Sequence, residues 1–274
     1  AGLSSWEILV SESQERMTVG VRPEDCEKFE ALASLHEVEA TAVGEFTDSG
    51  VFVVSHGETT VAHLPIHFLF DGCPQLNLES EWSPPFQMPV ETPELDEQGM
   101  GEVLAKLLAR PNIASKEWWV RSYDHEVIAQ SVIKPFCGIN HDSPGDAAVI
   151  APIQGGTQGL VVSNGIAPRY SDLDSYAMAA ATVDEALRNA VCVGVDLDLI
   201  AGLDNFCWPD PIESSKTPDG RYKLAQLVRA NRALDDVCRA YRLPCISGKD
   251  SMKNDAMMGG EKISVPPTLL FSLL

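Results

Sequence analysis

The 274-residue chain lacks any run of about 20 apolar residues, so no segment has the character of a membrane-spanning helix. It also opens without the pattern of a secretory signal peptide. Basic residues are scarce, with 20 Lys and Arg against 40 Asp and Glu and a formal net charge of -20. Such a charge repels nucleic-acid backbones and anionic lipids, so we expect neither nucleic acid nor a membrane among the partners.

Paired cysteines are also absent. The seven cysteines include no CxxC pair, and an odd number argues against the disulfide framework of a secreted protein. We therefore expect reduced cysteines packed as small apolar side chains in a cytoplasmic protein. Hydrophobic residues make up 45% and charged residues 22%, which is ordinary for a globular chain, and the length suits about two domains.

Residue patterns divide the chain into three parts. Residues 1–78 predict a helix at 23–36 and strands at 17–21, 38–46, 51–55 and 60–64. Residues 79–115 are rich in proline and acidic residues, which indicates a linker with one short helix at 101–109. Residues 116–274 predict an α/β or α+β domain with long helices at 176–193 and 224–241 and strands at 147–152, 159–163, 199–203, 244–246 and 263–274.

Asp146, Glu185 and Asn189 form the first group that could carry chemistry. Glu185 and Asn189 are four residues apart on a predicted helix, so their oxygens project from one face. Asp146 begins a predicted strand after a glycine, where its carboxylate could face that helix. Hard oxygen ligands of this kind suit Mg2+. The alternative is that Glu185 and Asn189 belong to the solvated face of the helix.

Two further segments are candidates for ligand contacts. Ser247-Gly248-Lys249-Asp250-Ser251 follows a predicted strand and combines a glycine with donors suited to phosphate, although it is not a Walker loop. A plain strand-to-turn connection explains the same residues. Glu12-Ser13-Gln14-Glu15-Arg16 precedes a predicted strand and could contact a carboxylate, amide or phosphate, or could be an exposed loop. The histidines show no metal-ligand spacing, and no cysteine has a neighbouring histidine to make it a nucleophile.

Six motifs in one order resemble the phosphoribosylformylglycinamidine synthase family, an ATP-dependent ligase of purine biosynthesis. They are Ser11-Glu12-Ser13-Gln14-Glu15-Arg16-Met17, Gly145-Asp146-Ala147-Ala148-Val149-Ile150, Ser163-Asn164-Gly165 with Pro168-Arg169-Tyr170, Asp184-Glu185-Ala186-Leu187-Arg188-Asn189, Leu203-Asp204-Asn205-Phe206, and Ser247-Gly248-Lys249-Asp250-Ser251. The resemblance covers most of 1–78 and 116–274 and almost none of the linker.

The resemblance implies domains of the PurM-like type, related to aminoimidazole ribonucleotide (AIR) synthetase. Residues 1–78 would be the end of the first copy's C-terminal domain, 79–115 the linker, and 116–274 the N-terminal domain of the second copy. The chain would then be an internal fragment without the family's catalytic residues, and inactive alone. Its partners would be formylglycinamide ribonucleotide, the remaining synthetase domains, and a glutaminase domain or subunit that supplies ammonia.

The resemblance also assigns site residues. Glu12, Ser13, Gln14 and Ser251 match substrate-binding positions. Lys116, Gly145, Gly248 and Lys249 match positions that bind nucleotide, and Asp146, Glu185 and Asn189 match ligands of Mg2+ beside ADP or ATP. Some family members have a metal-binding asparagine where Lys249 stands, and because lysine cannot ligate a cation, Lys249 would contact phosphate instead.

Two alternatives stay open on the sequence. The chain could belong to another AIR-synthetase-superfamily enzyme, such as a relative of selenophosphate synthetase or thiamine-monophosphate kinase, although the segment at 12–16 and the tandem arrangement speak against it. It could also be a non-catalytic nucleotide-binding or structural module.

Overall fold

The computed structural model describes residues 2–11, 16–85, 94, 96–123 and 128–274. The chain forms two compact units, 1–77 and 78–274, which are described separately. No helix in the described ranges has the length and apolar content needed to cross a membrane.

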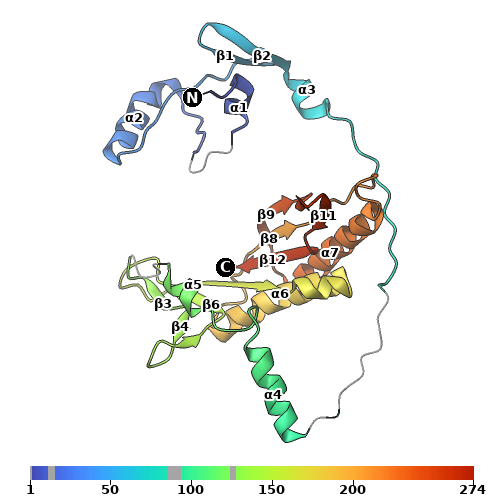
Figure 1. The fold of residues 1–274 in the computed structure, drawn as a ribbon. Helices are drawn as coiled ribbons and strands as arrows, with labels where there is room; N and C mark the ends of the chain where they lie inside the picture. The colour runs from blue at the N-terminus through green and yellow to red at the C-terminus, as the bar shows by residue number, and fades with distance from the viewer. Residues whose placement is uncertain (1, 12–15, 86–93, 95, 124–127) are drawn as a thin grey trace. The chain divides into compact units, whose positions relative to one another are not determined.

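The first unit consists of short helices and one β-hairpin (Figure 1). Its elements are α1 (Ser5–Leu9), η1 (Pro23–Asp25), α2 (Cys26–Leu35), β1 (Val51–His56), β2 (Thr59–Pro65) and α3 (Ile66–Asp71). The helix predicted at 23–36 is confirmed, and Pro23 begins it as expected for a first helical position. The strands expected near 51–55 and 60–64 are confirmed as the antiparallel pair β1–β2.

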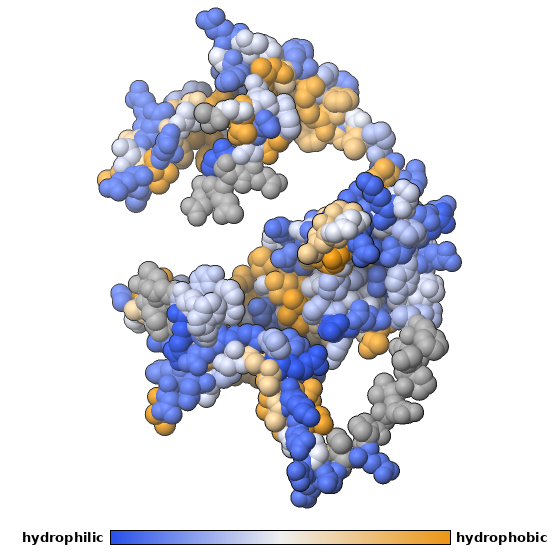
Figure 2. Space-filling model, viewed as in Figure 1, coloured by the Kyte–Doolittle hydropathy of each residue, from blue (hydrophilic) through white to orange (hydrophobic). Residues whose placement is uncertain are grey.

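Two strand predictions in this unit are wrong. The described residues of 17–21 and 38–46 form no strand, because no neighbouring segment pairs with them and nearly all of their side chains stay exposed. Large apolar side chains are exposed in α2 and α3 as well, including Leu35 and Phe70 (Figure 2). Alternation alone therefore did not identify a strand here, since a strand also needs a partner.

The second unit is built on a six-stranded sheet with strand order β3-β6-β7-β12-β8-β9 (Figure 1). Its elements are α4 (Glu97–Leu108), α5 (Glu117–Arg121), β3 (Ser131–Ile133), β4 (Phe136–Cys137), β5 (Ser143–Pro144), β6 (Ala147–Ile150), β7 (Leu160–Ile166), η2 (Pro168–Asp172), α6 (Ser175–Cys192), β8 (Gly202–Cys207), α7 (Gly220–Tyr241), β9 (Cys245–Ser251), β10 (Asp255–Met258), β11 (Glu261–Ser264) and β12 (Thr268–Leu273). Neighbouring strands of the sheet are antiparallel except β8 and β9, which run parallel.

Two long helices, α6 and α7, pack together on one face of this sheet. Alternate residues of β12 are buried, as in Leu269, Phe271 and Leu273, which is the pattern of a strand with one face against a core. Small residues of the helices, such as Ala186 and Ala230, are fully buried against them. The small side chains let the helices lie close to each other and to the sheet.

Both predicted long helices are confirmed, and three strand predictions need correction. The strand expected at 199–203 lies at 202–207, because residues 196–199 form a turn after α6. The strand expected at 263–274 is two strands, β11 and β12, since Pro266 and Pro267 interrupt the ladder between them. The strand expected at 244–246 continues to Ser251, so the segment 247–251 is not a turn.

The beginning of the predicted linker packs on α7. The Trp82 ring stacks on Tyr222 with centroids 5.3 Å apart, and the Arg229 guanidinium lies 4.3 Å from the Trp82 centroid. Arg221 forms an ion pair with Glu79 at 3.1 Å. Residues 79–82 are thus attached to the second unit, while the boundaries predicted at 78 and 116 stay predictions.

Candidate functional site

Helix α6 lies unusually close to β7, and Gly165 makes this possible. A Cβ atom at position 165 would overlap the backbone carbonyl oxygen of Thr182 and approach Ala186 N to 2.9 Å. Ser163, two residues earlier on the same face of β7, donates from Oγ to the Ala186 carbonyl at 2.8 Å. The glycine and the serine together hold the middle of α6 against the backbone of β7.

Glu185 and Asn189 reach from α6 to the backbone of the same strand. Glu185 Oε2 accepts a hydrogen bond from Ile166 N at 2.8 Å, and Asn189 Nδ2 donates to the Asn164 carbonyl at 3.0 Å. The β6–β7 pairing ends at Ala147 and Ser163, so β6 offers no partner for these two backbone groups. The two side chains are therefore more than a solvated helix face, because they complete the hydrogen bonding of an incomplete sheet edge.

Asp146 lies next to this position. It directly precedes Ala147, which pairs with Ser163, so it lies just beyond the end of the β6–β7 pairing. The backbone of Asn164 is the group that Asn189 contacts. The structure thus brings Glu185 and Asn189 to the end of β7, and Asp146 precedes the strand that pairs with it; that the three share one site stays a prediction.

The donor set at this end of the sheet fits a hard cation. Glu185 uses Oε2 and Asn189 uses its amide nitrogen on β7, which leaves Glu185 Oε1 and Asn189 Oδ1 available, and Asp146, directly before β6, is exposed. Carboxylate and amide oxygens with remaining water positions are typical of Mg2+. Across the described ranges no three His, Cys, Asp or Glu side chains are grouped to hold a metal, so a cation here would need the amide of Asn189.

The segment 247–251 lies at the other side of the sheet, in the edge strand β9. Gly248 pairs with Asp204, and a Cβ at Gly248 would come within 2.7 Å of Asp204 Oδ1. The glycine here leaves room for the Asp204 side chain, which would have to shift for a larger residue, and it does not form a turn. Burial raises the pKa of the Asp204 carboxyl; a hydrogen bond from its own backbone N–H opposes this effect, and the charge of Asp250 adds to it.

Paired residues place Lys249 on the sheet face that is turned away from α6 and α7. The row of paired residues that faces the helices comprises Gly248, Asp204, Phe271 and Gly165. The two adjacent rows face the opposite way, because side chains alternate along a strand. One of these rows comprises Lys249, Asn205, Leu270 and Ile166, and the other comprises Ser247, Leu203, Ser272 and Asn164. Lys249 therefore lies on the face opposite to α6, the helix that carries Glu185 and Asn189, and three strand spacings, about 14 Å, from the end of β7.

The remaining predicted nucleotide and substrate residues have different surroundings. Lys116 donates from Nζ to the carbonyls of Pro111, at 2.8 Å, and Ala114, so it closes a local turn before α5. Gly145 donates its N–H to the Pro135 carbonyl at 3.0 Å, directly before Asp146. Ser251, the last residue of β9, accepts at its carbonyl from Trp208 N at 2.8 Å. Gly145 directly precedes Asp146, whereas the hydrogen bonds of Lys116 are local to the turn before α5, and the nucleotide roles of both stay predictions.

Glu12, Ser13 and Gln14 lie outside the described residues, so their predicted contacts with substrate stay predictions. Sequence reasoning did not select Asn164 as a site residue, although its backbone meets Asn189. The signal that could have identified Asn164 is the run Ser163-Asn164-Gly165. Its serine donates a hydrogen bond to α6, and its glycine leaves room for that helix.

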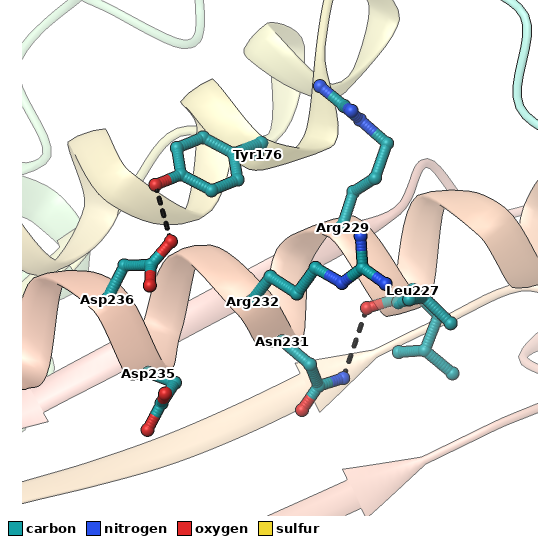
Figure 3. A pocket seen from close by; sticks show the side chains of 8 residues that line it. Tyr176, Leu227, Arg229, Asn231, Arg232, Asp235 and Asp236 are labelled. Atoms are coloured by element: carbon teal, nitrogen blue, oxygen red, sulfur yellow. Dashed lines mark hydrogen bonds between the residues drawn. The ribbon is translucent and has the colours of Figure 1, made fainter.

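A hollow lies between α6 and α7 (Figure 3). Tyr176 from α6 donates to Asp236 of α7 at 2.9 Å, and Asn231 donates to the Leu227 carbonyl at 3.1 Å. Arg229 is engaged by Asp174 at 2.6 Å. The charged groups that line this hollow are therefore largely paired within the protein, and the end of β7 with Glu185 and Asn189 remains the better candidate site.

Comparison with known proteins now identifies the family. Residues 1–57 match the model of the AIR synthase related protein C-terminal domain, and residues 144–266 match that of the N-terminal domain. Phosphoribosylformylglycinamidine synthase subunit PurL of Ignicoccus hospitalis is 34% identical over 273 residues, 99% of this chain and 36% of that protein. The chain is a PurL homologue. Its two matched domains have the PurM-like mixed α/β fold, in the predicted order.

Other PurL proteins agree. The subunit PurL of Thermomicrobium roseum is 33% identical over 97% of this chain and 34% of its own length. The structure of PurLQS from Thermotoga maritima aligns with 99% of this chain and 39% of that chain, at a TM-score of 0.65 and 25% identity. The structure of T. maritima PurL complexed with FGAR aligns with 99% of this chain and 38% of that chain, at a TM-score of 0.63 and 25% identity. The chain spans about a third of the length of the curated relatives it matches.

Proposed function

We propose that this chain is the part of a phosphoribosylformylglycinamidine synthase that binds Mg2+ and ADP or ATP at the junction of β6, β7 and α6. The full reaction would join ammonia, supplied from glutamine by a glutaminase partner, to formylglycinamide ribonucleotide at the expense of ATP. The observation that supports the proposal is that Glu185 and Asn189 both reach the end of β7 in a PurL homologue, with Asp146 directly before the strand that pairs with β7.

The charges of the site explain why a cation is needed there. Asp146 and Glu185 contribute two negative charges in a chain that already carries a net charge of -20. Bringing an anionic nucleotide to these two carboxylates without a cation would add repulsion. A divalent cation reverses the local field. Bound Mg2+ would neutralise the carboxylates and the phosphate oxygens together, and Asp146, Glu185 and Asn189 would hold it through oxygen atoms.

The other predicted residues would act from their own places in the chain. Lys249 lies about 14 Å across the sheet from the end of β7 and would offer its ammonium group to phosphate. Gly145 precedes Asp146 and would allow a ligand to approach the backbone. Ser251 ends β9 next to Lys249 and, with Glu12, Ser13 and Gln14, would contact formylglycinamide ribonucleotide, which T. maritima PurL is described as binding.

Calorimetric titration with formylglycinamide ribonucleotide, in the presence of Mg2+ and ADP, tests the synthase assignment. We expect the chain to bind the ribonucleotide and Ser251→Ala to weaken binding about fivefold, the effect of one lost hydrogen bond of about 1 kcal/mol. Ser215→Ala, in an exposed loop, is the matched control and should leave the affinity unchanged. Absence of binding by the wild-type chain, or equal effects of both substitutions, would contradict the assignment.

A further inference from the structure

Two cysteine thiols meet where α7 ends and β9 begins. Cys238 lies in the last turn of α7, Cys245 is the first residue of β9, and their Sγ atoms are 3.8 Å apart. All seven cysteines are free and all lie in described parts of the chain, and no other two of them share a thiol–thiol contact. The pair comes from two different elements, so its closeness depends on the turn between them.

That turn is fixed by backbone hydrogen bonds. Arg242 adopts a left-handed conformation with φ 56°, and Leu243 N donates to the Cys238 carbonyl at 2.8 Å. This is the bonding of a Schellman motif, in which the residue after the left-handed one contacts the last turn of the helix. Leu243 is buried, and the Pro244 carbonyl accepts from Gly202 N at 2.8 Å. The chain therefore holds Cys245 against the helix end in a defined position.

The two thiols differ in access. Cys245 is exposed, whereas Cys238 retains only 8% of its surface. The hollow beside them is lined by Asp204, Leu243 and Pro244 among others, and it opens to solvent. Burial and the neighbouring Cys245 raise the pKa of Cys238 to about 12. Burial also raises the pKa of Cys245, and the hydrogen bond from Cys238 opposes this shift, so the accessible Cys245 is the thiol that ionises more readily.

We propose that Cys238 and Cys245 form a reversible disulfide when the protein meets a small-molecule disulfide such as oxidised glutathione. The thiolate of Cys245 attacks one sulfur of that disulfide, which forms a mixed disulfide and releases one glutathione thiolate. Cys238 then loses its proton and attacks the sulfur of Cys245, which closes the protein disulfide and releases the second glutathione. Two protein thiols are oxidised, one glutathione disulfide is reduced, and each released thiolate takes up one proton.

The contact distance favours the second step. A disulfide requires the sulfurs to approach from 3.8 Å to about 2.05 Å, a movement of less than 2 Å that side-chain rotation at the exposed Cys245 can provide. The product would tie the end of α7 to the start of β9. Because β9 carries Gly248 and Lys249, the disulfide would restrain the strand at the edge of the candidate site.

Peptide mapping of the whole chain after oxidation tests this proposal. The protein is treated with oxidised glutathione, the free thiols are alkylated, and the chain is digested with trypsin. Cleavage after Arg232, Arg239, Arg242 and Lys249 places Cys238 in Ala233–Arg239 and Cys245 in Leu243–Lys249. We expect these two peptides joined by a bond that dithiothreitol breaks. If Cys245 instead carries glutathione while Cys238 is alkylated, or if either is joined to a third cysteine, the proposal is wrong.

Two variants make the outcome independent of any folding defect. Cys238→Ser removes a buried thiol, and it should leave Cys245 trapped as the glutathione mixed disulfide. Cys245→Ser removes the exposed thiol, and Cys238 should then remain unmodified. Cys192→Ser removes an exposed thiol at the end of α6 and is the matched control, in which the linked peptides should form as in the wild type. Modification of Cys238 in Cys245→Ser at the wild-type rate would overturn the proposed order of steps.

Discussion

Gly165 and Thr182 lie so close together that no side chain fits between the strand and the helix that carry them. A Cβ atom on Gly165 would overlap the Thr182 carbonyl oxygen, which belongs to the rigid backbone of α6 and cannot move aside. This contact sets the distance from α6 to β7. Glu185 and Asn189, on the same helix, reach the β7 backbone because of it.

Gly165→Ala should therefore destabilise the second unit by about 1–3 kcal/mol or more, the range for overpacking a filled core. Urea unfolding measures the loss. Gly101→Ala is the control, since it lies within helix α4 with no atom near the added methyl, and it should stabilise that helix by about 0.5–1 kcal/mol. Equal stability of Gly165→Ala and wild type would show that α6 is not held by this close approach.

Asp174 begins α6 and should make stability depend on acid pH. It accepts from Tyr176 N at 2.8 Å and pairs with Arg229 at 2.6 Å. Burial opposes its charge, but the hydrogen bonds and the Arg229 charge outweigh burial and lower its pKa below the ordinary 3.8. A lowered pKa means that the stabilisation is present above pH 3.8 and is lost as the pH falls through the lower value.

We expect Asp174→Asn to lower the free energy of unfolding by about 1 kcal/mol at pH 7, because it removes the charge that pairs with Arg229. The loss stays this small because the ion pair is partly exposed and asparagine can still cap the helix. The difference from wild type should shrink as the pH falls below about 3.8. Unfolding in urea across this pH range gives the comparison, with the exposed Asp172→Asn as control. A difference that stays constant with pH would exclude Asp174 as its source.

Asp204 should have the opposite effect. Its pKa is raised, chiefly by burial, so charging it costs stability as the pH rises from 3.8 toward the raised value. Asp204→Asn removes this cost and should be more stable than wild type at neutral pH, with the gain disappearing below about pH 3.8. Asp198→Asn, in an exposed turn, should show no gain that grows with pH. A less stable Asp204→Asn at pH 7 would mean that the charged form is the favoured one.

Local chemistry made some features predictable from the sequence. Pro23 marked the start of the helical segment 23–35, alanine content and the following Gly194 identified α6, and apolar residues on one side identified α7. The spacing of Glu185 and Asn189 predicted that both would reach one place. These are properties of a single helix and its ends, so neighbouring residues are sufficient to specify them.

Pairing between distant segments was not predictable in the same way. Residues 247–251 extend β9 because β8 lies parallel to them, which no local signal in Ser247-Gly248-Lys249 reveals. The same limit explains the wrong strand prediction at 38–46, a segment rich in strand-forming residues that has no pairing partner in the described structure. The bonds from Glu185 and Asn189 to β7 were likewise hidden, because they depend on where β6 ends.

Glu185 is a partner of the β7 backbone, and we propose that it is also a metal ligand. Thermal unfolding of Glu185→Gln separates these two roles. Glutamine keeps an oxygen that can accept from Ile166 N but removes the negative charge. We predict that unliganded Glu185→Gln unfolds close to the wild-type temperature. We predict that Mg2+ with ADP, at 100 times the dissociation constant, stabilises the wild type by about 2.7 kcal/mol and Glu185→Gln far less. Neither Mg2+ nor ADP alone should reproduce the wild-type shift. Equal shifts in both proteins would contradict the account and leave Glu185 with a structural role alone.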